Sequence, residues 1–191
     1  MYTKQISIVN PYYAKCMIER GMKIDELKIV EHFFIPTETD LEKITKSIKG
    51  CKEIVDIGSG YGLLINELAK RNPEIEFLGI DTMYYDKKFQ LPKAEKNVRF
   101  EFNGIEAMTS ARFKRKRKKF DGVICCWIPD QSEWRKMLSY LARKTVILVL
   151  SNDFSTGTIE TCIEGMKPFG FSIEKHWKSE KSVIQIWRKN E

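Results

Sequence analysis

Two acidic residues flank a glycine-rich stretch in the first half of the chain. Asp56 lies two positions before the run Gly58-Ser59-Gly60-Tyr61-Gly62, and Asp81 follows Gly62 by 19 positions. Glycines let the backbone turn sharply and approach a ligand that a Cβ would hold away. An acid at the end of the next strand accepts hydrogen bonds from the hydroxyls of a ribose. The spacing therefore predicts a site for a ribose-containing cofactor.

The details of this stretch separate two kinds of cofactor. A dinucleotide-binding loop has the pattern G-x-G-x-x-G, whereas here the third glycine comes one position early and residue 63 is leucine. The carboxylate of Asp56 would repel a pyrophosphate and attract an ammonium group. S-adenosylmethionine carries a ribose, a cationic amino-acid end and a sulfonium. It fits this pattern better than a nicotinamide dinucleotide, and an oxidoreductase is therefore disfavoured.

Short strand-like runs alternate with helical stretches from residue 51 onward, which predicts a parallel sheet covered by helices. Near-continuous apolar character suits strands that are buried on both faces. Two further runs, separated by a short polar connection, predict a terminal antiparallel hairpin. In chain order, the expected strands are 53–57, 76–81, 98–103, 121–127, 146–151, 171–177 and 183–188.

The expected helices come from apolar residues at helical spacing. Thr39 followed by Glu42 predicts a capping box for the first of them, and Gly50 lies just past its end. Between 82 and 97 the periodicity is poor and Pro92 interrupts it, which predicts a short or irregular connection there. The expected helices span residues 40–48, 61–71, 131–143 and 158–167.

The run Asp56-Ile57-Gly58-Ser59-Gly60-Tyr61-Gly62 resembles the first motif of class I S-adenosylmethionine-dependent methyltransferases. The resemblance covers roughly residues 51–188. It implies an α/β, Rossmann-like, doubly wound fold, with a mostly parallel seven-stranded sheet that ends in an antiparallel β-hairpin. It divides the chain into a short N-terminal helical cap at 1–50 and a catalytic domain at 51–191.

The resemblance also implies which residues bind S-adenosylmethionine, with S-adenosylhomocysteine as the product. Asp56 and the glycine loop would hold the methionine part, and Asp81 would hold the ribose. Asn103 lies where the family often has an acid, and its amide would pair with the adenine edge. The implied cofactor-binding residues are Asp56, Ile57, Gly58, Ser59, Gly60, Tyr61, Gly62, Asp81, Thr82, Met83, Asn103, Gly104 and Cys126.

The methyl acceptor is expected beyond the fourth strand, where the chain reads Cys126-Trp127-Ile128-Pro129-Asp130. Enzymes that methylate exocyclic amino groups of bases typically carry an Asn/Asp-Pro-Pro-aromatic tetrapeptide here. Only Pro129 is kept, so the resemblance does not support a DNA amino-methyltransferase. Trp127 and Asp130 are the candidate catalytic residues. Trp127 either stacks on a flat acceptor or closes the core, and Asp130 either takes a proton or caps the following helix.

The charge of the chain is concentrated in one segment. Lys and Arg number 33 against 26 Asp and Glu, and the run Arg112–Lys119 holds seven of the basic residues and no acid. The remaining chain is neutral, which favours a small molecule or a protein as the acceptor, with RNA next. The basic run is an auxiliary RNA contact, an import-like peptide or a solvated helix end.

The remaining composition narrows the class of protein. No apolar run has the length of a membrane span or a signal peptide, which predicts a protein of the cytoplasm, or of the nucleus if the basic run directs import. The five cysteines form no C-x-x-C pair, so no metal site is predicted. Since no general base stands out, a non-catalytic methyltransferase-fold subunit that binds RNA or protein remains the alternative to an enzyme.

Overall fold

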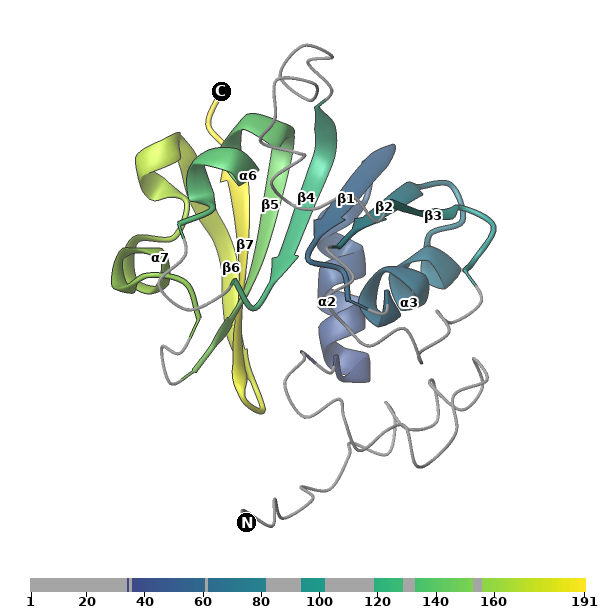
Figure 1. Cartoon of the computed structure of the whole chain (residues 1–191), viewed down its shortest axis with the longest axis horizontal. Coiled ribbons are helices and arrows are strands. Elements are labelled where there is room, and N and C mark those ends of the chain that lie inside the picture. Colours follow the sequence, from purple (N-terminus) through teal and green to yellow (C-terminus); the bar gives the residue numbers. More distant parts are fainter. Residues whose placement is uncertain are drawn as a thin grey trace.

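The computed structural model describes residues 34, 36–60, 62–81, 94–101, 119–128, 133–152 and 156–191 (Figure 1). Most of the basic run and of the expected irregular connection lie outside these residues. The candidate site residues outside them are Tyr61, Thr82, Met83, Asn103, Gly104 and Asp130.

Seven strands form one sheet in the order β3-β2-β1-β4-β5-β7-β6. The first five strands along the chain are parallel, and β7 and β6 continue the sheet beyond β5 as an antiparallel hairpin. This confirms the expected sheet. The strands are β1 (Glu53–Ile57), β2 (Glu76–Ile80), β3 (Val98–Glu101), β4 (Phe120–Cys126), β5 (Ala142–Ser151), β6 (Phe171–Ser179) and β7 (Ser182–Lys189).

The helices in the described residues are shorter than expected after residue 130. Residues 142–145, in part assigned to a helix by their spacing, belong to β5 because Ala142 pairs with Phe120 of β4. The last expected helix ends at Gly165, whose positive φ of 53° breaks the helical path. The helices are α2 (Glu38–Ile48), α3 (Leu63–Arg71), α6 (Arg135–Leu141), α7 (Ile159–Glu164) and the 3-10 helix η2 (Lys167–Phe169). None of these described helices is long and apolar enough to cross a membrane.

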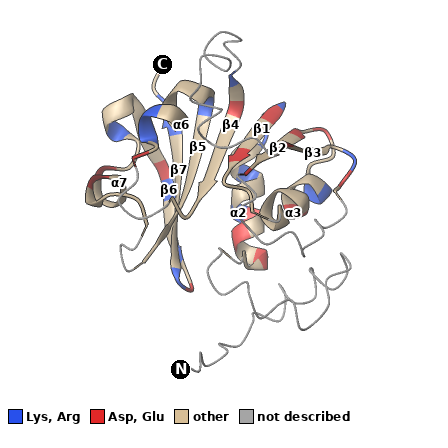
Figure 2. Ribbon diagram, viewed as in Figure 1, with Lys and Arg blue, Asp and Glu red and all other residues tan. Residues whose placement is uncertain are grey.

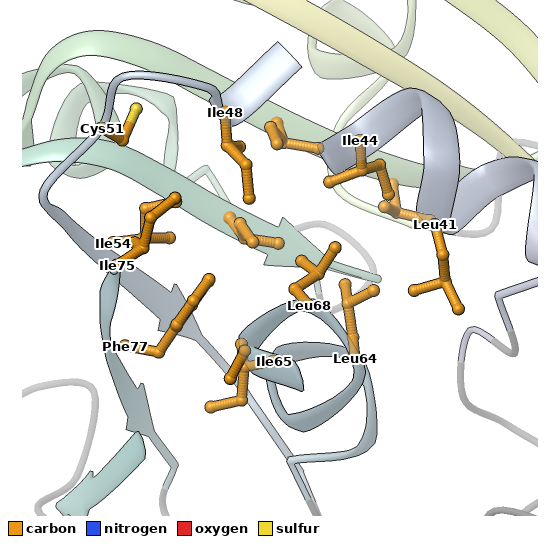
Figure 3. Close-up of a cluster of buried hydrophobic side chains, with 14 of the residues drawn as sticks. Leu41, Ile44, Ile48, Cys51, Ile54, Leu64, Ile65, Leu68, Ile75 and Phe77 are labelled. Atoms are coloured by element: carbon orange, nitrogen blue, oxygen red, sulfur yellow. The ribbon is translucent and has the colours of Figure 1, made fainter. Parts of the chain in front are cut away.

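The core consists of two clusters of buried side chains, one on each face of the sheet. In the first cluster, shown in Figure 3, Leu41 and Ile44 of α2 lie near Leu64 and Leu68 of α3, and Ile54 of β1 belongs to the same cluster. The second cluster joins β1, β4 and β5 to α6 and the segment after α7. Each fully buried aliphatic side chain contributes about 1.5–3 kcal/mol to the free energy of folding, relative to the same side chain exposed to water. The packing of these two clusters fixes the position of the sheet edge at which the parallel strands end.

The expected capping box at the start of α2 is wrong by two residues. The N-cap is Thr37, whose hydroxyl accepts a hydrogen bond from the Asp40 N–H at 3.2 Å, while the Asp40 carboxylate accepts the Thr37 N–H at 2.9 Å. Asp40 is buried and also accepts the indole N–H of Trp177 at 2.7 Å and the Ser179 hydroxyl. These contacts with the hairpin stabilise the earlier start, and local sequence does not show them.

Candidate functional site

The glycine loop joins the end of β1 to the start of α3, as its sequence indicates. Gly58, Gly60 and Gly62 have φ values of 76°, 53° and 71°. All three lie in the left-handed region, where a side chain other than glycine is strained by about 1–2 kcal/mol. The alternating glycines are therefore required by the path of the backbone.

The backbone N–H groups of this loop are used within the protein. Those of Gly58 and Ser59 donate to the carbonyl of the last residue of β2, at 2.8 and 3.1 Å, and that of Gly62 donates to the Ser59 carbonyl at 2.8 Å. The Gly60 N–H donates to Oδ2 of Asp81 at 2.7 Å. A phosphate-binding loop instead directs its N–H groups at the ligand. The geometry of these four N–H groups therefore disfavours a pyrophosphate.

Asp56 is a buried carboxylate with an unsatisfied oxygen. It lies in β1 between Gly79 of β2 and Ile124 of β4, is 2% exposed, and its Oδ1 has no hydrogen-bond partner among the described residues. Burial, and then repulsion from Asp81, raise the pKa of Asp56 to about 8. A cation placed beside this oxygen would favour the ionised carboxylate and supply the missing partner.

Asp81 lies at the same edge of the sheet, directly after β2. It is 5% exposed, and its N–H donates to the carbonyl of Glu101 at the end of β3 at 3.4 Å. The Ser59 hydroxyl, within the loop, is buried without a hydrogen-bond partner among the described residues. Leaving such a group unsatisfied costs about 1–3 kcal/mol. Asp56, Ser59 and Asp81 thus bring buried polar atoms to one edge, and two of these atoms have no hydrogen-bond partner within the described part of the chain.

Two other candidate residues at this edge belong partly to the core. The Ile57 side chain is fully buried in the second cluster, and Cys126 packs against the first. Burial, followed by the charge of Asp56, raises the pKa of Cys126 and of the neighbouring Cys125 well above the usual range of a thiol. Both cysteines are therefore neutral. In the described part of the chain, no group of three or more His, Cys, Asp or Glu residues is placed to hold a metal ion.

Trp127 follows β4 in a strained backbone conformation, with a φ of 53°. Its N–H donates to the Val149 carbonyl at 2.8 Å, and its indole N–H donates to the Ser182 hydroxyl at 3.1 Å. The ring packs against the first core cluster and remains partly exposed. These contacts hold the indole in place between the end of β4 and the start of β7, and its role toward an acceptor stays a prediction.

Two aromatic residues next to the glycine loop were not found from the sequence. A Cβ built on Gly62 would lie 2.2 Å from Cζ of Phe100, and one on Gly79 would lie 2.6 Å from Cδ1 of the same ring. A Cβ on Gly58 would lie 3.9 Å from the Trp134 ring. The one available signal was Gly79, because a glycine inside a strand often marks close packing.

No family model matches the chain. A curated relative, the tRNA (guanine-N(7)-)-methyltransferase of Thermotoga maritima, is 28% identical in an alignment of 152 residues that covers 73% of this chain and 45% of the relative. The chain thus spans less than half the length of this relative.

Solved structures of methyltransferases share the fold. The ribosomal protein L11 methylase of Lactobacillus delbrueckii subsp. bulgaricus matches with a TM-score of 0.58 and 14% identity, over 83% of this chain and 82% of that one. Human N-acetylserotonin methyltransferase in complex with S-adenosylmethionine matches with a TM-score of 0.52 and 14% identity, over 78% and 52% of the two chains. Together with the strand order, these matches show that the chain has the fold of class I methyltransferases.

The residues at the carboxyl edge fit the cofactor of that fold. The unpartnered buried oxygen of Asp56 is suited to an ammonium group, and Asp81 brings a second buried carboxylate beside the loop for the hydroxyls of a ribose. The internal hydrogen bonds of the loop agree with a ligand that has no pyrophosphate. S-adenosylmethionine has each of these properties.

Proposed function

We propose that this chain is an S-adenosylmethionine-dependent methyltransferase. The observation that carries the proposal is the pair of buried carboxylates, Asp56 and Asp81, on either side of a glycine loop whose four described N–H groups donate within the protein. When bound, S-adenosylmethionine supplies an electrophilic methyl group on a sulfonium.

The protein's own residues then have three tasks. Asp56 binds the amino group of the amino-acid end, where the pair is shielded from water and the attraction is strong. Asp81 accepts hydrogen bonds from the ribose while it holds the loop through Gly60. Methyl transfer is an in-line displacement, so the remaining task is to align the acceptor and exclude water. Trp127, held by Ser182, is the described residue that we assign to the wall of the acceptor site.

We further propose RNA as the acceptor. Outside the basic run the chain has no net charge, which by itself favours a small molecule or a protein over RNA as the acceptor. The curated relative is named as a tRNA methyltransferase, and on this ground we rank RNA first. The basic run Arg112–Lys119 is in keeping with a polyanionic acceptor. Asp130, three positions after Trp127 in the sequence, is the candidate base for an acceptor that holds its proton at neutral pH.

Labelled methyl transfer tests the proposal. The purified protein is incubated with methyl-labelled S-adenosylmethionine and, in separate reactions, with total RNA, a protein extract and a small-molecule extract from its source cells. Label in the RNA fraction supports the full proposal, and label only in another fraction retains the enzyme but overturns RNA as the acceptor.

The alternative is a non-catalytic subunit with the same fold. Binding of S-adenosylhomocysteine with no label transferred to any fraction would favour it. No binding of S-adenosylhomocysteine by calorimetry would contradict both the cofactor assignment and the enzyme.

A further inference from the structure

An irregularity between β4 and β5 places two cations side by side. Phe120 pairs with Ala142, but Gly122 pairs with Thr145, so that Asp121 faces two residues of β5, Arg143 and Lys144. In a regular strand, successive side chains point to opposite faces, whereas an inserted residue locally breaks this alternation. Both cations are exposed, with 52% and 55% of their side-chain surface accessible.

Asp121 is the carboxylate around which these cations gather. It lies 3.9 Å from Arg143 and 3.3 Å from Lys144, and it accepts the N–H of Lys52 at 2.7 Å. Burial opposes its ionisation, but the Lys52 N–H and the two cations outweigh this effect and lower the pKa of Asp121. The carboxylate is thus ionised, and it neutralises only part of the positive charge around it.

An aromatic ring and a further lysine extend this surface. Tyr140, at the end of α6, is 41% exposed, and the Lys119 ammonium lies 5.6 Å from the centre of its ring. Lys119 is exposed and is the last residue of the basic run in the sequence. We name the residues Lys52, Lys119, Tyr140, Arg143 and Lys144 the amino-edge cluster.

The cluster lies at the edge where the parallel strands begin, opposite the cofactor edge. Figure 2 shows basic segments at the starts of β4 and β5. Glu53 and Glu76 are the acids at the starts of β1 and β2. They are opposite each other in the register of these two strands and lie farther along the sheet from β5. The positive surface is therefore centred on β4 and β5.

We infer that the amino-edge cluster is a binding surface for RNA, with cations for the phosphates and Tyr140 for stacking on a base. This inference rests on the proposed function and deepens it. Exposed lysines and arginines beside an exposed aromatic ring are the combination that binds the backbone and bases of unpaired nucleotides.

The position of the amino-edge cluster implies a minimum length for the RNA acceptor. The seven residues of β4 separate the two edges by roughly 20 Å at about 3.3 Å per residue. A single nucleotide cannot reach both edges, so the acceptor is an RNA of several nucleotides or more that extends around the sheet. The cluster then contributes to RNA binding and does not contribute to methyl transfer itself.

Fluorescence anisotropy with a labelled transfer RNA transcript, at increasing concentrations of KCl, tests the inference. The double variant Arg143→Glu/Lys144→Glu should weaken binding by about tenfold and reduce the slope of log K against log salt by about 1–2, because two phosphate contacts are lost. Tyr140→Ala should weaken binding without changing that slope. A milder pair, Arg143→Gln/Lys144→Gln, serves if the charge reversal prevents folding.

The matched control is Lys178→Glu/Lys181→Glu, which makes the same change of charge at the exposed end of the terminal hairpin. It should change affinity by less than about twofold. Absence of binding by the wild type, wild-type affinity in the Arg143/Lys144 variants, or an equal loss in the control would overturn the inference. Calorimetry with S-adenosylhomocysteine on the same variants keeps this outcome separate from a failure of the proposed function.

Discussion

The backbone N–H of Gly60 donates a 2.7 Å hydrogen bond to Oδ2 of Asp81, 21 positions further along the chain. One carboxylate therefore shapes the middle of the glycine loop and lies at the edge where we propose that the ribose binds. The glycine loop and Asp81 are consequently a single structural unit, although the loop follows β1 and Asp81 follows β2.

Replacement of Asp81 by Ala should abolish most of the affinity for S-adenosylhomocysteine. The variant loses hydrogen bonds to a charged acceptor, each of which contributes about 1.5–3 kcal/mol, and it frees the Gly60 N–H. Isothermal titration calorimetry measures the effect. Asp121→Asn, which changes a buried acid at the opposite edge, is the control and should bind normally. Wild-type affinity in Asp81→Ala would remove the ribose contact.

The stability of the ligand-free protein should depend on pH through Asp56. Its pKa is about 8 in the folded state against 3.8 in the unfolded chain. Between these values the folded state holds a proton that the unfolded state has released, so the free energy of unfolding falls as pH rises from about 4 to about 8. The decrease should be on the order of a few kcal/mol.

Urea denaturation of the wild type and of Asp56→Asn, at several pH values in this range, isolates that contribution. The variant should lack the decrease attributable to residue 56, and its stability should exceed that of the wild type at pH 8. Parallel pH profiles of the two proteins would show that this carboxylate does not titrate as described.

Ligand binding should release a proton from the same residue. At pH 7 the free protein holds Asp56 largely protonated, because burial and then repulsion from Asp81, directly after β2, raise its pKa to about 8, and the neighbouring thiols of Cys125 and Cys126 on β4 are neutral. An ammonium group favours the carboxylate. Calorimetry in two buffers of different ionisation enthalpy should report about one proton released, and Asp56→Asn should release none.

Gly62→Ala should destabilise the protein more than Gly50→Ala. Both positions have positive φ, at 71° and 83°, but a Cβ at Gly62 would lie 2.2 Å from the Phe100 ring while one at Gly50 meets nothing within 4 Å. The first variant has the backbone strain of about 1–2 kcal/mol plus an overpacking penalty of about 1–3 kcal/mol. Urea denaturation compares them. Phe100→Leu should recover part of the Gly62→Ala loss, and equal losses at the two glycines would contradict the close packing.

Much of the fold follows from patterns that are local in the sequence. The apolar runs at β1, β4 and β5 identify buried parallel strands, and the polar connection between β6 and β7 identifies the hairpin. The loop with Asp56 and Asp81 also follows from local spacing, because the ends of adjacent parallel strands meet at one edge.

The features that were missed depend on contacts between distant residues. Asp40 starts α2 through Thr37 while it bonds to Trp177, which lies 137 positions away. Ala142 fits the helical spacing of the sequence but belongs to β5, because it pairs with Phe120 of β4. In the sequence, Phe100 has only the pattern of an ordinary strand residue. The space that Gly62 and Gly79 leave for its ring is visible only in the structure. None of these three partnerships leaves a periodic signal.

A crystal structure of the chain with S-adenosylhomocysteine tests the assignment of the two carboxylates. We expect the ligand's amino group within hydrogen-bonding distance of Asp56 and its ribose hydroxyls on Asp81, with the Gly60 N–H still bonded to Asp81. A ligand bound elsewhere, or bound at this edge without contact to either carboxylate, would contradict this assignment.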